Sequence, residues 1–163
     1  IKLGVVLVPV ANASNYLSAN LINVSSLDSA VDLLSKLNEQ LVWLKGGGQP
    51  LTDSHLAKLS VLQKITRLNL DGTEITDSGL SRLKSLNALI YLNMNNTKVT
   101  STGIRNLTSL KQLQAVFLYG TNIKAEEIES TRKLLPNTIF EMGNYVVPLL
   151  AFDTTEAKAP VNK

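Results

Sequence analysis

The chain has 163 residues, of which 44% are hydrophobic and 18% charged, a composition typical of one folded domain. The net charge is +3 and the basic residues are scattered, so nothing in the sequence supports nucleic-acid binding. Cysteine is absent and His55 is the only histidine, which excludes thiolate chemistry, haem attachment through C-x-x-C-H and a histidine-rich metal site. No apolar run reaches the ~20 residues of a membrane helix, so we expect no direct membrane insertion.

The first predicted element is the apolar run LGVVLVPV at 3–10, which predicts one buried strand at the N-terminal edge of the fold. Pro9 lacks an N–H group and suits an edge strand. Residues 1–15 are therefore expected to form an N-terminal cap. The chain begins with Ile1 and shows no signal-peptide pattern, so we expect a part of a larger protein.

A repeating unit of about 24 residues dominates the rest of the chain. Matching positions hold apolar residues in every copy, as in the column Leu44, Leu68, Leu92 and Val116. The copies are YLSANLINVSSLDSAVDLLSKL at 16–37, LVWLKGGGQPLTDSHLAKLSVL at 41–62, ITRLNLDGTEITDSGLSRLKSL at 65–86, LIYLNMNNTKVTSTGIRNLTSL at 89–110, LQAVFLYGTNIKAEEIESTRKL at 113–134 and the half copy NTIFEMG at 137–143. The step from the first copy to the second is one residue longer than the later steps. About five repeats thus span 16–143.

Each unit contains one strand and one helix. In segment 67–71, RLNLD, apolar residues alternate with polar ones, which predicts a strand whose Leu68 and Leu70 side chains point inward. A stripe of leucines spaced by three follows from position 80 and predicts a helix. Because one unit cannot bury both stripes alone, the units must stack into a solenoid.

Polar and small residues between strand and helix predict the turns. Thr76 and Asp77 stand where they can cap the free N–H groups of the helix. Gly79 and Gly103 lie near the helix starts, where a missing side chain allows neighbouring turns to approach closely. Thr73 and its copies follow the strand, and a buried hydroxyl there can hydrogen-bond to the backbone of the turn.

Three positions depart from the pattern. Gly46 replaces an inward leucine, so we expect the segment 45–48 to be underpacked and loose. His55 stands where the next two units have glycine and is expected to be exposed near a helix start. Thr131 replaces a helical leucine as the array nears its end, and Pro136 is expected to end the last helix.

The pattern L-x-x-L-x-L-x-x-T-x-[IV]-T-D-x-G-L-x-x-L-x-x-L resembles the leucine-rich repeat family in a bacterial form that carries T-D-x-G-L. The resemblance implies an α/β solenoid with parallel strands on the concave face and helices on the convex face. The segment GVVLVPVANASNYLSANLIN, with the later LVWL, also resembles the C-terminal repeat domain of bacterial membrane-anchored planctomycete-type cytochrome c proteins. That second resemblance implies a parent protein in the cell envelope and a location in the periplasm.

Aromatic and polar side chains gather at the outward positions of the predicted strands. Such residues are enriched in binding interfaces, although outward strand positions also favour aromatics through β-propensity alone. The predicted partner-binding residues are Trp43, Arg67, Asn69, Tyr91, Asn93, Phe117 and Tyr119.

The C-terminal part carries a second apolar run, VVPLLAF at 146–152. We expect 144–153 to form a C-terminal cap and 154–163 to form a flexible tail, so that 1–153 make one leucine-rich-repeat domain.

The sequence predicts a monomeric, non-catalytic interaction module of a bacterial envelope protein that binds a protein or a glycan on its concave face. No nucleophile–base pair and no metal-ligand set is visible, so we expect no enzyme activity, no cofactor and no metal site. Two alternatives remain open. The domain could be a structural spacer, or it could dock a partner as an accessory domain of a membrane-bound cytochrome-type redox protein.

Overall fold

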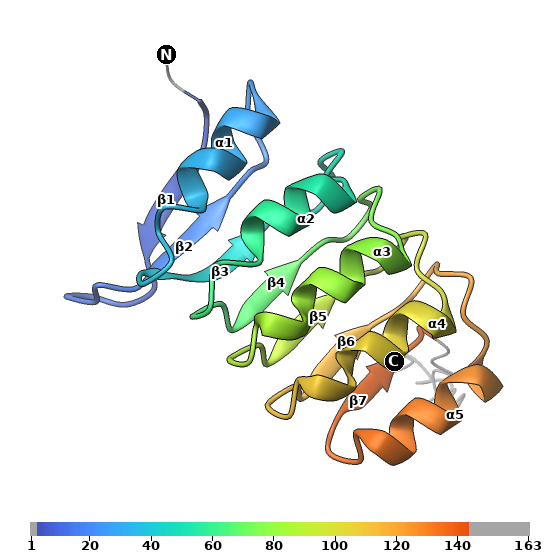
Figure 1. Cartoon of the computed structure of the whole chain (residues 1–163). Coiled ribbons are helices and arrows are strands. Elements are labelled where there is room, and N and C mark those ends of the chain that lie inside the picture. Colours follow the sequence, from blue (N-terminus) through green and yellow to red (C-terminus); the bar gives the residue numbers. More distant parts are fainter. Residues whose placement is uncertain (1–2, 144–163) are drawn as a thin grey trace, which may run out of the picture.

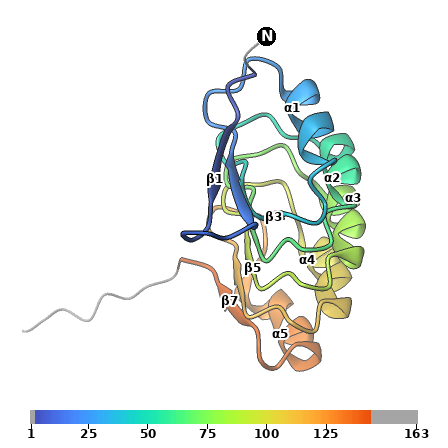
Figure 2. The ribbon, with the colours of Figure 1, turned by 90° about the vertical axis from the view of Figure 1, so that its left-hand side faces the viewer.

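The computed structural model describes residues 3–143, and the predicted C-terminal cap and tail lie outside them. Seven strands form one sheet whose spatial order is the chain order. The sheet lines one side of the molecule and the helices line the other (Figures 1 and 2). This is the predicted leucine-rich-repeat solenoid, with strands on the concave face and helices on the convex face.

The strands and helices alternate along the chain from β2 onwards. The strands are β1 Val6–Pro9, β2 Leu17–Asn20, β3 Leu41–Lys45, β4 Arg67–Asn69, β5 Tyr91–Asn93, β6 Ala115–Phe117 and β7 Ile139–Glu141. The α-helices are α1 Leu27–Leu34, α2 Asp53–Leu59, α3 Asp77–Leu80, α4 Ser101–Ile104 and α5 Ala125–Leu134. Two 3-10 helices, η1 Ser81–Ser85 and η2 Arg105–Ser109, continue α3 and α4. The 3-10 form suits these units because it has three residues per turn, which aligns leucines spaced by three.

The parallel strands keep the register that the repeat predicts. Leu68 pairs with Leu44 on one side and with Leu92 on the other, each of them one repeat length away. Between β2 and β3 the register shifts, because Leu17 pairs with Leu41 whereas Ser18 pairs with Trp43. This irregularity absorbs the longer step between the first unit and the second.

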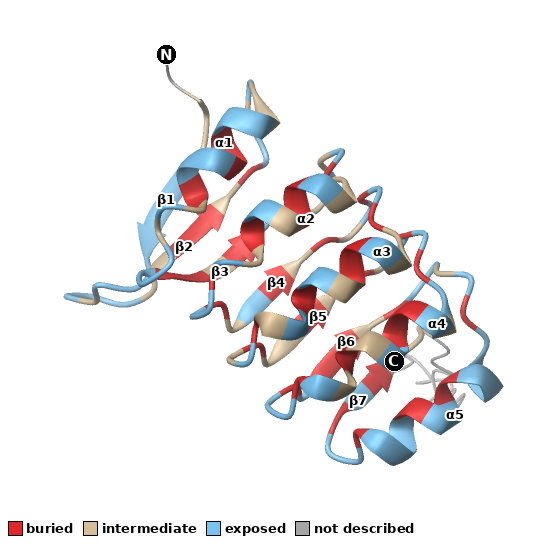
Figure 3. Ribbon diagram, viewed as in Figure 1, coloured by how far each residue is buried: buried red, intermediate tan, exposed pale blue. Residues whose placement is uncertain are grey.

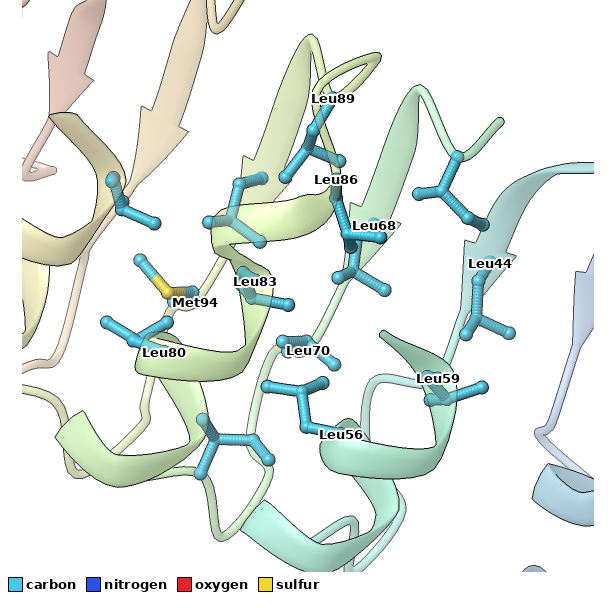
Figure 4. Packing of buried hydrophobic residues seen from close by; sticks show 14 of the residues in the cluster. Leu44, Leu56, Leu59, Leu68, Leu70, Leu80, Leu83, Leu86, Leu89 and Met94 are labelled. Carbon is cyan, nitrogen blue, oxygen red and sulfur yellow. The ribbon is translucent and has the colours of Figure 1, made fainter. Parts of the chain in front are cut away.

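The hydrophobic core runs between the sheet and the helices (Figure 4). Leu44, Leu68 and Leu92 come from the strands, and each is at most 4% exposed. The leucines of the helical stripes meet them from the other side, and burial recurs in each unit (Figure 3). Each strand leucine lies between neighbouring units, so the core stabilises their stacking.

The predicted helix cap is confirmed for Thr76 but not for Asp77, whose carboxylate binds the next unit instead. Thr76 Oγ1 accepts a hydrogen bond from the N–H of Ser78, as expected of a capping residue. Asp53 reaches across from the preceding unit, where its Oδ1 accepts from the N–H of Thr76 at 2.9 Å and its Oδ2 from the Thr76 hydroxyl at 2.6 Å. A Cβ at Gly79 would overlap Asp53 Oδ1, so the glycine provides the space for this bond between units.

The same arrangement joins the next two units. Asp77 accepts hydrogen bonds from the N–H of Thr100 at 2.8 Å and from its hydroxyl at 2.6 Å. A Cβ at Gly103 would overlap Asp77 Oδ1. The buried Thr73 hydroxyl donates to the carbonyl of Leu70 at 2.6 Å, which confirms the structural role expected of this threonine.

His55 is buried at 8% exposure, so the prediction that it is exposed is wrong. Its Nδ1 accepts a hydrogen bond from the N–H of Thr52 at 3.0 Å and lies 3.0 Å from the Thr52 hydroxyl. Its Nε2 lies 3.3 Å from Asp28 Oδ1 without hydrogen-bond geometry. His55 therefore accepts the hydrogen bond of the N-cap N–H within its own unit. In the next two units an aspartate of the preceding unit accepts that bond. The surrounding turns bury the His55 ring.

Replacing His55 with alanine should lower the free energy of unfolding by about 1 kcal/mol, because the Thr52 N–H loses its acceptor. His55→Gln should retain most of the stability, since glutamine at the third helical position can reach back to the same N–H. Urea denaturation followed by circular dichroism measures both. Equal losses for the two variants would show that the ring's packing, not its acceptor atom, is what matters.

Strand β1 lies at the N-terminal edge as predicted, but it is exposed along its whole length, so the prediction of a buried strand is wrong. It pairs antiparallel with β2 alone. Val6 and Val8 are 46% and 48% exposed. These side chains stay exposed because β1 is an edge strand, with no further unit stacked on its outer side among the described residues (Figure 2).

The expectation that segment 45–48 is underpacked is also wrong. Gly46 is buried, and a Cβ at this position would collide with Leu51 Cδ1. Leu51 is fully buried and fills the space that an inward leucine occupies in the next unit. At the other end of the array, Thr131 is buried at the position of the helical leucine, and α5 ends before Pro136, as predicted.

Candidate binding face

The outward side chains of the strands form the concave strand face, defined here as the outward positions of β3 to β7 and the second residue after each of these strands. Parallel pairing places Arg67 between Trp43 on β3 and Tyr91 on β5. One residue of each strand thus stands beside its counterpart in the next unit. This alignment follows from the constant repeat length. The outward side chains at equivalent positions of successive strands therefore form rows across the sheet.

Arg67 is held between two aromatic rings. Its Cζ lies 4.8 Å from the centroid of the Trp43 ring and 4.7 Å from the centroid of the Tyr91 ring. Both distances are within the range of cation–π attraction. The stack limits the freedom of an exposed arginine and of two half-buried aromatics before any partner arrives, which reduces the entropy cost of binding.

A hollow of about 260 Å³ lies over this stack. Six of the seven predicted residues line it: Trp43, Arg67, Asn69, Tyr91, Asn93 and Phe117. Lys45 also lines the hollow, although the sequence prediction did not include it. The sequence places Lys45 in the same outward row as Asn69, Asn93 and Phe117, but the prediction kept only the aromatic, arginine and asparagine side chains of the rows.

The two asparagines, Asn69 and Asn93, are half-buried and have a structural role. Asn69 Oδ1 accepts a hydrogen bond from the N–H of Asp71 at 2.9 Å, and Asn93 Oδ1 accepts from the N–H of Asn95 at 2.9 Å. These bonds close the turns at the ends of β4 and β5. The side-chain oxygens are thereby committed to the fold.

The seventh predicted residue, Tyr119, lies outside the first hollow and is 58% exposed. It lines a second hollow of about 320 Å³ with Asn95, Phe117, Glu141 and Gly143. Phe117 lines both hollows and so connects them. The sequence prediction missed Glu141, which occupies the same row as Phe117 one strand further on.

Charges are arranged differently on the two faces. On the convex face, Lys58 Nζ lies 2.7 Å from Asp32 Oδ1 and 3.9 Å from Asp28 Oδ1. The hydrogen bond that Lys58 donates to the Asp32 carboxylate raises the pKa of Lys58 above its usual value. On the concave strand face, neither Lys45 nor Arg67 forms an ion pair with another described residue.

Within residues 3–143, no three side chains of His, Cys, Asp or Glu come together in a way that could hold a metal ion. None of the described helices combines the length and the apolar character needed to span a membrane.

No protein-family model and no curated protein matches the chain. Solved structures do match. An internalin C2 from Listeria monocytogenes shares 25% sequence identity with a TM-score of 0.49, over 66% of this chain and 54% of that one. An internalin (inlF) from the same species shares 20% identity with a TM-score of 0.45, over 68% of this chain and 36% of that one.

A third match comes from a plant. The LRR ectodomain of the membrane receptor kinase GASSHO1/SCHENGEN3 from Arabidopsis thaliana, solved in complex with CASPARIAN STRIP INTEGRITY FACTOR 2, shares 18% identity with a TM-score of 0.46. The match covers 68% of this chain and 14% of that one, so this chain spans only a small part of the ectodomain's length. The chain is similar to these proteins. Its own repeat and its stacked units show that it folds as a leucine-rich-repeat solenoid.

Proposed function

We propose that this domain is a non-catalytic interaction module that binds a partner protein on its concave strand face. The observation that supports the proposal best is the Arg67 guanidinium held between Trp43 and Tyr91, with all three side chains lining a hollow formed largely by outward side chains. Stacked arginine and aromatic residues are the side chains most enriched at binding hot spots. The internalin and receptor-ectodomain likeness agrees with the proposal but does not carry it.

A protein partner fits this face better than a glycan. Sugars bind proteins through flat contacts with open aromatic faces. Here Arg67 covers one face of the Trp43 ring and one face of the Tyr91 ring. The group offered to a partner is therefore the guanidinium, which carries several N–H donors. Such a group recognises carboxylates and carbonyl oxygens. The bacterial envelope setting and the periplasmic location remain part of the proposal and rest on the sequence resemblance. The monomeric state is proposed with them.

A double substitution in the concave strand face tests the proposal. The double variant Trp43→Ala, Tyr91→Ala removes both rings of the stack and should weaken binding to a partner recovered by affinity capture by at least tenfold, or about 1.4 kcal/mol. Isothermal titration calorimetry with the purified partner measures the dissociation constant. Lys84→Ala, an exposed change on η1, is the matched control and should leave it unchanged. Equal affinities for the two variants would contradict a concave binding site.

A further inference from the structure

We infer that the partner presents an extended peptide segment with a charge pattern, an acidic side chain over Lys45 and Arg67 and a basic side chain against Glu141. This inference rests on the proposed function, since it specifies what the concave strand face recognises. It is carried by how charges are distributed between the two hollows.

The first hollow is the positive end. Lys45 and Arg67 stand on neighbouring strands, both exposed, and no carboxylate lines the hollow. The Cζ atom of Arg67 lies over the rings of Trp43 and Tyr91, and the side chain is exposed, so the guanidinium keeps N–H donors available to a partner. A planar donor edge with a second cation beside it matches a carboxylate.

The second hollow is the negative end. Glu141 is half-buried on β7, and it is the one charged side chain among the residues that line this hollow. It forms no ion pair with another described residue. Phe117 and Tyr119 stand beside it, so a long basic side chain can lay its aliphatic part on the rings and its charge on the carboxylate.

The distance between the two ends sets the length of the segment. From β4, which carries Arg67, to β7, which carries Glu141, the sheet advances by three strands. At about 4.8 Å per strand this is about 14 Å, the span of about four residues of extended chain. Phe117 lies between the two hollows and offers an apolar contact to the residues in the middle.

The mixed charge also selects the class of ligand. A polyanion, such as a nucleic acid or an acidic glycan, that extends from Arg67 along the face would place negative charge next to Glu141 and would be repelled there. Asp71, at the end of β4, adds a second negative charge on the same face, where its Oδ1 accepts a hydrogen bond from Asn96. A peptide with one acidic and one basic residue satisfies both ends.

The experiment selects peptides from a random phage-displayed library on the full-length chain. Trp43 is the only tryptophan, so its fluorescence reports binding of the synthesised peptides directly. We expect enriched peptides to carry an acidic and a basic residue about four positions apart. Arg67→Glu should weaken their binding at least tenfold, and a peptide whose acidic residue is changed to arginine should restore it. Glu141→Arg should behave in the same way toward the basic residue.

The controls separate this inference from the proposed function. Lys84→Glu reverses a charge on the convex face and should leave peptide affinity unchanged. Loss of binding in Trp43→Ala, Tyr91→Ala, measured by calorimetry, together with full binding in Arg67→Glu and Glu141→Arg, would overturn the charge pattern and leave the concave site standing. Enriched peptides without charge, or no enriched peptide at all, would also overturn it. Unchanged binding in every variant would overturn both proposals.

Discussion

Replacing Leu92 with alanine is expected to lower the free energy of unfolding by about 3 kcal/mol, because it leaves a cavity in the middle of the stacked core. Leu92 is fully buried on β5, and its neighbours in register, Leu68 and Val116, belong to the adjacent units. The loss therefore weakens two interfaces between units as well as one unit. Urea denaturation followed by circular dichroism gives the value.

The matched control for this cavity is Leu33→Ala. Leu33 lies on α1 and is 41% exposed, so the same chemical change removes little buried surface there. Its cost should be below about 1 kcal/mol. If both variants lost the same stability, the units would not share a buried core, and the stacked solenoid would be wrong.

Gly103→Ala should destabilise the protein by about 2 kcal/mol, even though alanine is the better helix former. The added Cβ would overlap Asp77 Oδ1. The carboxylate would have to move and give up its hydrogen bonds to the N–H and hydroxyl of Thr100. A steric effect of one methyl group thus breaks a contact between two units.

A double-mutant cycle shows whether this mechanism is correct. In an Asp77→Ala background the carboxylate is already gone, so Gly103→Ala should cost at least about 1 kcal/mol less than in the original chain. Thr102→Ala, at the exposed neighbouring position, serves as the control and should change stability by less than about 0.5 kcal/mol. Purely additive free energies for the Asp77 and Gly103 changes would contradict the proposed clash.

The solenoid was predictable from the sequence because its cause is local and repeated. Leu68 and Leu92 recur at a fixed step, and a strand leucine at a fixed step can be buried only against its copy in the next unit. The outward rows follow from the same register, since side chains alternate along a strand. For this reason six of the seven predicted face residues line one hollow, and the seventh lines the next.

The exceptions depend on contacts between residues that the repeat does not relate. His55 is buried because its Nδ1 takes over the acceptor role that an aspartate of the preceding unit has elsewhere, and a single copy gives no periodic signal. The space beside Gly46 is filled by Leu51, whose Cδ1 would collide with a Cβ at position 46, and the spacing of apolar residues does not reveal this contact.

The repeat alone establishes which residues face inward, which face outward and in what order the units stack, because a constant repeat length fixes the register. The folded chain was needed to show that Arg67 is held between Trp43 and Tyr91, and that Lys45 and Glu141 stand at opposite ends of one face. Those relations depend on side-chain conformations and on hollows shared by several strands. Periodicity places a side chain in a row, but it does not say which neighbour that side chain contacts.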